Sequence, residues 1–191
     1  KENNSDGASN FKSRLSARGF KEMGDGWYVK TITPAESLKG KRVLLDFEGI
    51  MYVGDVYLNG KRIGGTDYGY LGFDIDISKL LNYGQPNTIA VHASTSGPMN
   101  SRWYTGGGLF RDINLITTPA DIYFARHPLF VTTRDNHLVD LQIEVANYTK
   151  RNDIKLRTTI ADQQGNIVYD KTADMHFNRK MRTNELKWET I

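Results

Sequence analysis

The sequence has 191 residues, of which 39% are hydrophobic and 25% charged, with a formal net charge of +3. These values predict a soluble globular protein and argue against a disordered chain. The absence of cysteine excludes disulfides and thiolate metal sites. No apolar run approaches the roughly 18 residues of a membrane-spanning helix, and residues 1–10 lack the apolar stretch of a signal peptide. Basic and acidic residues are interleaved, so we expect no nucleic-acid-binding surface.

The first part of the chain consists of short segments that alternate between apolar and polar residues and are separated by Gly, Asn and Asp. This period of two is typical of β-strands joined by turns. Asn59-Gly60 predicts a two-residue hairpin, because both residues tolerate a positive φ. In chain order, we expect strands over residues 41–48, 55–59, 73–77, 88–93 and 109–116.

Pro119 and Ala120 mark a predicted boundary, after which the alternation starts again. We expect further strands over residues 138–146, 154–160, 167–170 and 185–190, with a turn at 163–166. An immunoglobulin-like sandwich usually has about seven strands and about 100 residues. The second block, with four or five strands, is therefore predicted to be an incomplete sandwich within this sequence.

The stretch GPMNSRWYTGGGLFR, residues 97–111, is the strongest candidate for a binding loop. Aromatic faces can stack on sugar rings and Arg can donate hydrogen bonds to hydroxyls, while glycines permit an irregular loop that holds these groups. The alternative is a tryptophan that fills the core beneath a loop, and the residue types alone leave both interpretations open. The side chains concerned are Arg102, Trp103 and Tyr104.

Catalytic chemistry of the chain's own is not expected. A glycosidase needs two carboxylates about 5–10 Å apart, whereas Asp74, Asp76 and Glu144 occupy the polar positions of alternating strands and are interpreted as solvated side chains. Asn184-Glu185 has the form of the dipeptide that carries the acid in many retaining glycosidases, but we interpret it as coincidence because no barrel surrounds it.

No metal or cofactor site is expected either. The run of three glycines at 106–108 lacks the lysine and the preceding strand of a phosphate loop, and we interpret it as a tight turn. Asn147-Tyr148-Thr149 is a formal glycosylation acceptor of a kind that is common by chance. The histidines lack metal-ligand spacing and are interpreted as structural or surface residues: His92, His127, His137 and His176.

Six motifs follow one another between residues 26 and 113: Gly26-Trp27-Tyr28, Phe47-Glu48-Gly49, Val56-Tyr57-Leu58-Asn59-Gly60, GYLGFDIDI at 69–77, NTIAV at 87–91 and SRWYTGGGLFRDI at 101–113. In this order they resemble the N-terminal sugar-binding domain of glycoside hydrolase family 2, which includes bacterial β-galactosidase and β-glucuronidase. Each motif alone is weakly specific, whereas all six together are specific.

The resemblance implies an all-β fold with a jelly-roll β-sandwich over residues 26–118, followed by a partial immunoglobulin-like β-sandwich over 119–191. Residues 1–25 form a poorly defined segment that lacks the family's further strand and its Pro-His-Asp-Trp-like segment. Ser101 stands where some members have an aspartate that contacts sugar or a metal ion, so no metal is expected here.

The resemblance also implies a function. The catalytic glutamates of the family belong to a TIM barrel that follows the second domain, so no residue of this chain is expected to be catalytic. Side chains at the edge of the substrate pocket would be Ser101, Arg102, Trp103 and Tyr104. The expected parent is a retaining exo-glycosidase of the β-galactosidase type, periplasmic or secreted, whose partners are a terminal sugar, its own barrel and further copies of itself.

Two other functions fit the same residues. A free-standing carbohydrate-binding module would bind sugar without cleaving it. A structural or interaction sandwich would bury Trp103 in its core, and replacing Arg102 would then change nothing functional.

Overall fold

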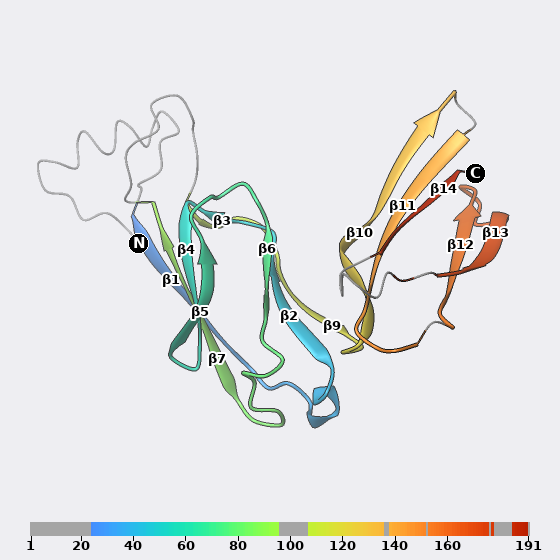
Figure 1. Cartoon of the computed structure of the whole chain (residues 1–191). Coiled ribbons are helices and arrows are strands. Elements are labelled where there is room, and N and C mark those ends of the chain that lie inside the picture. Colours follow the sequence, from blue (N-terminus) through green and yellow to red (C-terminus); the bar gives the residue numbers. More distant parts are fainter. Residues whose placement is uncertain are drawn as a thin grey trace, which may run out of the picture. The chain divides into compact units, whose positions relative to one another are not determined.

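The protein is described by a computed structural model that covers residues 24–95, 107–135, 138–151, 153–175, 177 and 185–190. The chain divides into two compact units, residues 1–118 and 119–191. The described residues form fourteen β-strands and one 3-10 helix, so the predicted all-β fold class is confirmed (Figure 1). None of the described helical residues belongs to a helix long and apolar enough to cross a membrane.

Unit 1 contains a four-stranded sheet of order β1-β7-β4-β5, a three-stranded sheet of order β6-β2-β9 and a short pair, β3-β8. All the pairings are antiparallel. The strands are β1 (Asp25–Ile32), β2 (Arg42–Phe47), β3 (Ile50–Met51), β4 (Val53–Leu58), β5 (Lys61–Thr66), β6 (Phe73–Asp76), β7 (Asn87–Ser94), β8 (Gly108–Leu109) and β9 (Ile113–Thr118), with the 3-10 helix η1 (Glu36–Leu38) after β1.

The two larger sheets of unit 1 share one apolar core. Alternate residues of β2, β4 and β7 are buried in a single cluster, as the period of two predicted. Because the cluster draws on both sheets, they pack face to face as a β-sandwich. The core residues from these strands are Val43, Leu45, Phe47, Val56, Leu58, Ile89, Val91 and Ala93.

The predicted hairpin at Asn59-Gly60 is confirmed. Both residues have a positive φ, 50° and 82°, and the flanking Leu58 and Lys61 are paired between β4 and β5. Asn59 does more than turn the chain, because its side-chain carbonyl accepts a hydrogen bond of 2.9 Å from the Thr88 N–H. The hairpin is thereby attached to the start of β7.

The Asn87 side chain, which is fully buried, joins this hairpin to the turn before β7. Its oxygen accepts hydrogen bonds from Asn59 Nδ2 at 3.0 Å and from the Asn82 N–H at 2.9 Å. Its amide nitrogen donates to the carbonyls of Asn82 and Gln85, both at 2.8 Å. All four hydrogen bonds of this amide are therefore made inside the protein.

The strand predicted over residues 109–116 is wrong in one respect, because it is broken into β8 and β9. Phe47 pairs with Ile113 and Ile50 pairs with Leu109. The two residues between Phe47 and Ile50 therefore lie opposite the three residues between Leu109 and Ile113. The extra residue makes a β-bulge, which local alternation cannot reveal because its cause is the pairing with a distant strand. Glu48 N–H donates to the Asp112 carbonyl at 3.1 Å across this bulge.

Unit 2 has a sheet of order β10-β11-β14 and a second pair, β12-β13. Its strands are β10 (Ile122–Arg134), β11 (Leu138–Asn147), β12 (Lys155–Ala161), β13 (Ile167–Asp174) and β14 (Glu185–Thr190). Leu141, Ile143 and Val145 of β11 are buried together with Leu156 and Met175, as the alternation of 138–146 predicted. The immunoglobulin-like identity of this unit and the predicted domain bounds stay predictions.

A turn after β6 holds a carboxylate in its charged form. The Asp76 carboxylate accepts hydrogen bonds from the Ser78 N–H and hydroxyl and lies 3.3 Å from Arg42 Nε. Partial burial raises the pKa of Asp76, but the hydrogen bonds from Ser78 and the charge of Arg42 outweigh it and leave the pKa below 3.8.

Replacing Asn87 by Ala should destabilise unit 1 by about 3 kcal/mol, because it leaves several buried partners without a hydrogen bond. Urea unfolding of the 191-residue chain measures this. Thr88→Val, at the next and exposed position, is the matched control and should change the free energy of unfolding by less than about 0.5 kcal/mol. Equal effects of the two changes would contradict the role given to Asn87.

Stability should depend on Asp76 only at pH values where its carboxylate is charged. Its folded pKa is depressed, so its contribution is fully present above the unfolded value and is lost as the pH falls through the folded pKa. The difference in unfolding free energy between wild type and Asp76→Asn should therefore be constant above about pH 5 and shrink below about pH 3.8. A difference that stays constant in acid would contradict this account.

Candidate functional site

The residues that the sequence analysis placed at the edge of a sugar pocket are Ser101, Arg102, Trp103 and Tyr104, and all four lie outside the described residues. Their roles therefore stay predictions. The structure does describe both flanks of this stretch, Thr95 on one side and Gly107 to Arg111 on the other. These flanks define where in unit 1 the stretch begins and ends.

The two flanks meet at one corner of the sandwich. The buried Thr95 hydroxyl accepts a hydrogen bond from the Gly24 N–H at 2.6 Å and donates to the Gly24 carbonyl at 2.8 Å. A Cβ atom at Gly107 would lie only 2.7 Å from Thr95 Cγ2, so the Gly107 backbone lies directly against the Thr95 side chain. Residues 24, 95 and 107 therefore form one junction, which we call the loop base.

Gly108 fits where no other residue would. Its φ of +95° is strained for a residue with a side chain, and an added Cβ would lie 2.1 Å from the Tyr28 hydroxyl oxygen. Gly107 and Gly108 thus serve close packing, and Gly108 begins β8, while the interpretation of the whole glycine run as a tight turn stays a prediction. Gly106 lies outside the described residues.

The bulge between β8 and β9 turns an aromatic and a cationic side chain outward. Phe110 is 45% exposed, and the Arg111 guanidinium lies 5.0 Å from the centroid of its ring. Arg111 Nη1 also donates to the Glu48 carbonyl at 3.3 Å, which fixes the guanidinium beside the bulge. Bulges commonly redirect side chains in this way next to binding sites.

Residues of the β5–β6 connection extend this exposed surface. A Cβ added at Gly49 would approach both the Phe110 ring, at 2.8 Å, and the Gly69 carbonyl, at 3.3 Å, so the connection lies against the bulge. Tyr68 and Tyr70 have ring centroids 5.7 Å apart and are largely exposed. We call the resulting surface the aromatic edge: Tyr68, Tyr70, Leu71, Phe110 and Arg111.

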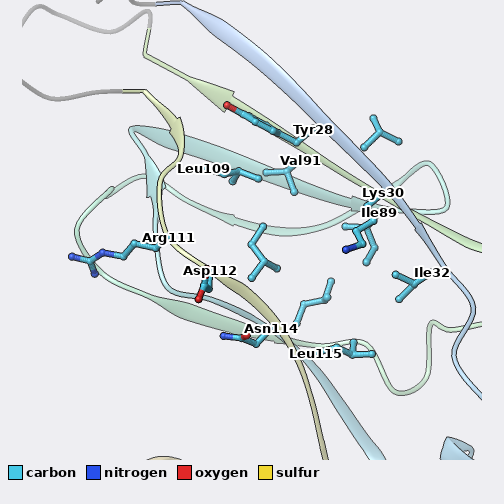
Figure 2. Close-up of a pocket in the computed structure, with 13 residues that line it drawn as sticks. Tyr28, Lys30, Ile32, Ile89, Val91, Leu109, Arg111, Asp112, Asn114 and Leu115 are labelled. Atoms are coloured by element: carbon cyan, nitrogen blue, oxygen red, sulfur yellow. The ribbon is translucent and has the colours of Figure 1, made fainter. Parts of the chain in front are cut away.

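A cavity of about 410 Å³ opens between the two sheets where the edge strands β1 and β9 face each other. Its lining is mainly aliphatic and includes Ile89, Val91 and Leu115, with Tyr28 toward the loop base. Figure 2 shows these side chains gathered between the strands and the Arg111 guanidinium pointing away from them. Asp112 is the only carboxylate among its described lining residues, so the cavity does not offer a glycosidase pair.

Unit 2 contains a groove of about 710 Å³ between β10, β11 and β12. Its lining is again mainly apolar, with Val131, Leu141 and Leu156 among the residues, and none of the described lining residues is acidic. A group of three His, Cys, Asp or Glu side chains that could hold a metal ion does not occur in the part of the chain that the structure describes.

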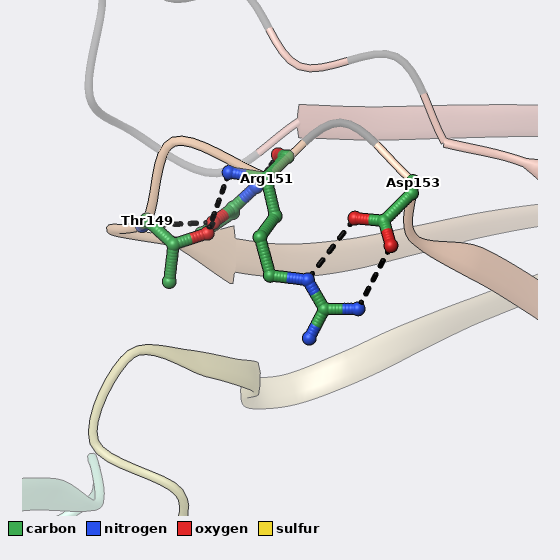
Figure 3. A network of polar contacts seen from close by, with 4 residues as sticks. Thr149, Arg151 and Asp153 are labelled. Carbon is green, nitrogen blue, oxygen red and sulfur yellow. Dashed lines mark hydrogen bonds and ion pairs between the residues drawn. The ribbon is translucent and has the colours of Figure 1, made fainter.

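The formal glycosylation acceptor at Asn147 is a structural residue in this fold. Its side-chain oxygen accepts hydrogen bonds from the Thr149 N–H at 2.9 Å and the Thr149 hydroxyl at 2.7 Å, and its Nδ2 donates to the Arg151 carbonyl. Figure 3 shows the Arg151 guanidinium directed at both oxygens of Asp153, a pair that lowers the pKa of Asp153. These contacts organise the turn between β11 and β12.

The described part of the candidate site is a surface of unit 1. Tyr28 lines the cavity beside the loop base, and the aromatic edge and the cavity share Arg111. Together they offer aromatic, aliphatic and guanidinium groups, which are side-chain types that can bind a ligand. The sequence analysis included Phe110 and Arg111 in the stretch 97–111, but it gave no site role to Tyr28, Thr95 or Tyr68. A hydrophobic pattern gives no signal for these three, because their role comes from the meeting of distant segments.

Comparison with known proteins agrees with this geometry. Residues 15–102 match the family model described as the glycosyl hydrolase 2 galactose-binding domain-like domain. A β-galactosidase of Bacteroides ovatus is 29% identical over 150 residues, which are 76% of this chain and 18% of the relative. A β-glucuronidase of Bacteroides fragilis is 32% identical over 114 residues, 57% of this chain and 16% of the relative.

Solved structures give the same result. A glycosyl hydrolase family 2 member from Bacteroides cellulosilyticus matches with a TM-score of 0.76 and 29% identity, covering 90% of this chain and 24% of that protein. The chain thus spans a quarter or less of the length of each of these proteins. The resemblance found in the six sequence motifs is confirmed by the family model, by these relatives and by this solved structure.

The loop base makes one position highly sensitive to substitution. Gly108→Ala should destabilise unit 1 by about 2–4 kcal/mol, since it adds both backbone strain and a clash with Tyr28. Gly60→Ala is the matched control: its φ is +82° but its Cβ would meet nothing within 4 Å, so only strain of about 1 kcal/mol is expected.

Chemical denaturation of both variants, alone and in a Tyr28→Phe background, separates the two contributions. Removing the hydroxyl should recover part of the loss in Gly108→Ala and none in Gly60→Ala. Equal losses at Gly108 and Gly60, unaffected by Tyr28→Phe, would show that no clash exists at the loop base.

Proposed function

We propose that this chain, which carries the galactose-binding-like domain of glycoside hydrolase family 2, is the non-catalytic accessory part of a retaining exo-glycosidase of the β-galactosidase type. In such an enzyme a separate barrel domain supplies the acid/base and the nucleophile. The two units described here support and shape that active site. Hydrolysis of terminal glycosidic bonds is the activity of the whole enzyme.

A single observation carries this proposal. The likeness to a family 2 glycosyl hydrolase extends over 90% of this chain, across both units, but over only 24% of the larger protein. A separate binding module would be expected to share one unit with enzymes of this family, not two consecutive ones. The cavity and groove linings agree with a non-catalytic role, since neither contains a pair of carboxylates among its described residues.

In the proposed enzyme, the stretch that leaves from the loop base borders the sugar pocket through Arg102 and Trp103. The loop base supports such a role, because it holds the flanks of the stretch at a corner packed by Thr95, Gly107 and Gly108. Groups positioned by a rigid sheet contribute to substrate orientation at little entropic cost. The neighbouring aromatic edge offers a surface on which the barrel could dock.

The proposal extends to the setting of the enzyme. We place the parent enzyme in the periplasm or outside the cell as a further part of this proposal. Contacts between copies of the enzyme, including through this accessory part, complete the proposal. The relatives of this chain include both a β-galactosidase and a β-glucuronidase. An activity assay with a β-galactoside and a β-glucuronide therefore decides which substrate the parent enzyme prefers.

The test uses the complete protein encoded by the natural reading frame that contains these residues. It should hydrolyse 4-nitrophenyl β-galactoside with retention of configuration, as followed by proton NMR of the first-formed sugar, whereas the 191-residue chain should be inactive. Arg102→Ala or Trp103→Ala should lower kcat/KM of the complete enzyme by about tenfold or more, a loss of about 1.4 kcal/mol per factor of ten.

Lys61→Ala, which removes an exposed cation from the hairpin, is the matched control for Arg102→Ala and should leave kcat/KM unchanged. Preference for the β-glucuronide would keep the glycosidase assignment and correct the substrate. Absence of glycosidase activity in the complete protein would overturn the proposal.

A further inference from the structure

The outer face of the four-stranded sheet in unit 1 carries an exposed aromatic group that plays no part in the core. Trp27 on β1 is 60% exposed. Its ring is stacked on His92 of β7, with centroids 4.7 Å apart and planes 29° apart, and contacts Tyr57 of β4 at a centroid distance of 5.5 Å. We call these three side chains the sheet platform.

Strand register explains how the platform forms. Trp27 of β1 pairs with His92 of β7. Tyr57 of β4, on the other side of β7, pairs with Ala90, which lies two residues from His92 along the same strand. The indole that reaches both His92 and Tyr57 therefore extends over β7, where the small Ala90 side chain leaves room for it. The contacts on two strands fix the ring, while most of its surface faces solvent.

Polar groups surround these rings. The Asp55 carboxylate is paired with Arg62 at 2.6 Å, and Asp25 Oδ1 lies 3.9 Å from His92 Nε2. The side chains of Asp25, Asp55 and Arg62 are 53%, 32% and 60% exposed. An exposed aromatic surface with hydrogen-bonding groups at its rim is the combination that binds a ligand with one apolar face and many hydroxyls.

Two features of the platform restrict the class of ligand that it could bind. The rim holds two carboxylates, one of them balanced by Arg62, so it accepts hydrogen bonds from hydroxyls and disfavours an anionic sugar. The planes of Trp27 and Tyr57 are tilted by 42°. Sugar rings stacked on both would be tilted as well, which a single soluble chain can accommodate and the flat face of a crystalline polysaccharide cannot.

We propose that the sheet platform is a carbohydrate-binding surface for a soluble chain of neutral, β-linked pyranose units, separate from the stretch that leaves the loop base. The apolar face of one unit stacks on Trp27 and that of its neighbour on Tyr57, while Asp25, Asp55 and Arg62 bind hydroxyls. The proposal rests on the geometry of this face alone and holds whether or not the parent enzyme is a β-galactosidase.

The 191-residue chain itself provides the reporter, since it has three tryptophans, Trp27, Trp103 and Trp188. Each gives one indole N–H signal in a nitrogen–proton correlation spectrum, and Trp27→Phe assigns the first by its loss. Titration with β-1,4-galactotetraose or cellotetraose should shift the Trp27 signal saturably, with a dissociation constant in the millimolar range that suits two exposed rings. Maltotetraose, which is α-linked, and digalacturonate should leave it unshifted.

Tyr57→Ala should weaken binding about fivefold, as expected for one lost aromatic contact, whereas Val29→Ala, at a 66% exposed position of the same strand as Trp27, should not. The remaining signals of each variant report whether the fold is intact. A Trp27 signal that stays fixed with both β-linked sugars overturns the proposal. Shifts confined to Trp103 overturn it as well, and would assign sugar binding to the loop instead.

Discussion

The buried amide of Asn87 is the contact on which the arrangement of unit 1 depends most. A fully buried amide is tolerated only when its donors and acceptors are all satisfied, and Asn87 meets this condition only if the hairpin at Asn59 and the turn at Asn82–Gln85 come together at the start of β7. The side chain therefore specifies register as well as stability. With β7 in register, β4 places its inward residues in the common core, and Trp27 of β1, Tyr57 of β4 and His92 of β7 meet on the outer face as the sheet platform.

The second determinant is the bulge between β8 and β9. A continuous strand would have pointed Phe110 and Arg111 alternately into and away from the sandwich. The additional residue instead directs both toward solvent beside Gly49 and the β5–β6 connection, and it sets β8 against Tyr28 at the loop base. A one-residue irregularity in pairing thus places two exposed side chains, Phe110 and Arg111, between β8 and β9.

The sequence predicted the elements whose signals are local. β4 and β7 alternate cleanly, and Asn59-Gly60 is a local turn signal. In β2 the predicted core residues Val43, Leu45 and Phe47 are buried, but Leu44 and Asp46 are buried as well. β10 was missed because Pro128 interrupts it and a register shift between Phe124 and Leu129 removes the alternation, so the strand depends on its pairing with β11. β5 contains Gly64 and Gly65, which have low strand propensity. Its existence follows from the hairpin and not from its own pattern.

The candidate site was predictable to a smaller extent. The motif around Arg102 and Trp103 directed attention to one stretch, but no local pattern shows that Thr95, Gly24 and Gly107 meet at its base. The exposure of Trp27 could not be predicted from the sequence either, because an alternating strand does not reveal whether its outer face is covered by another layer. Both findings depend on long-range contacts, which a single sequence encodes only indirectly.

The closed geometry of the loop base has a consequence for how such domains diversify. When the two ends of a connecting segment are already held together by the scaffold, the entropic cost of lengthening the segment rises only with the logarithm of its length. Insertions, deletions and replacements between Thr95 and Gly107 therefore leave the sandwich nearly as stable as before, while the side-chain chemistry of the segment can change completely. One scaffold can in this way carry many different segments, provided that Gly24, Thr95 and Gly107 at the base stay in place.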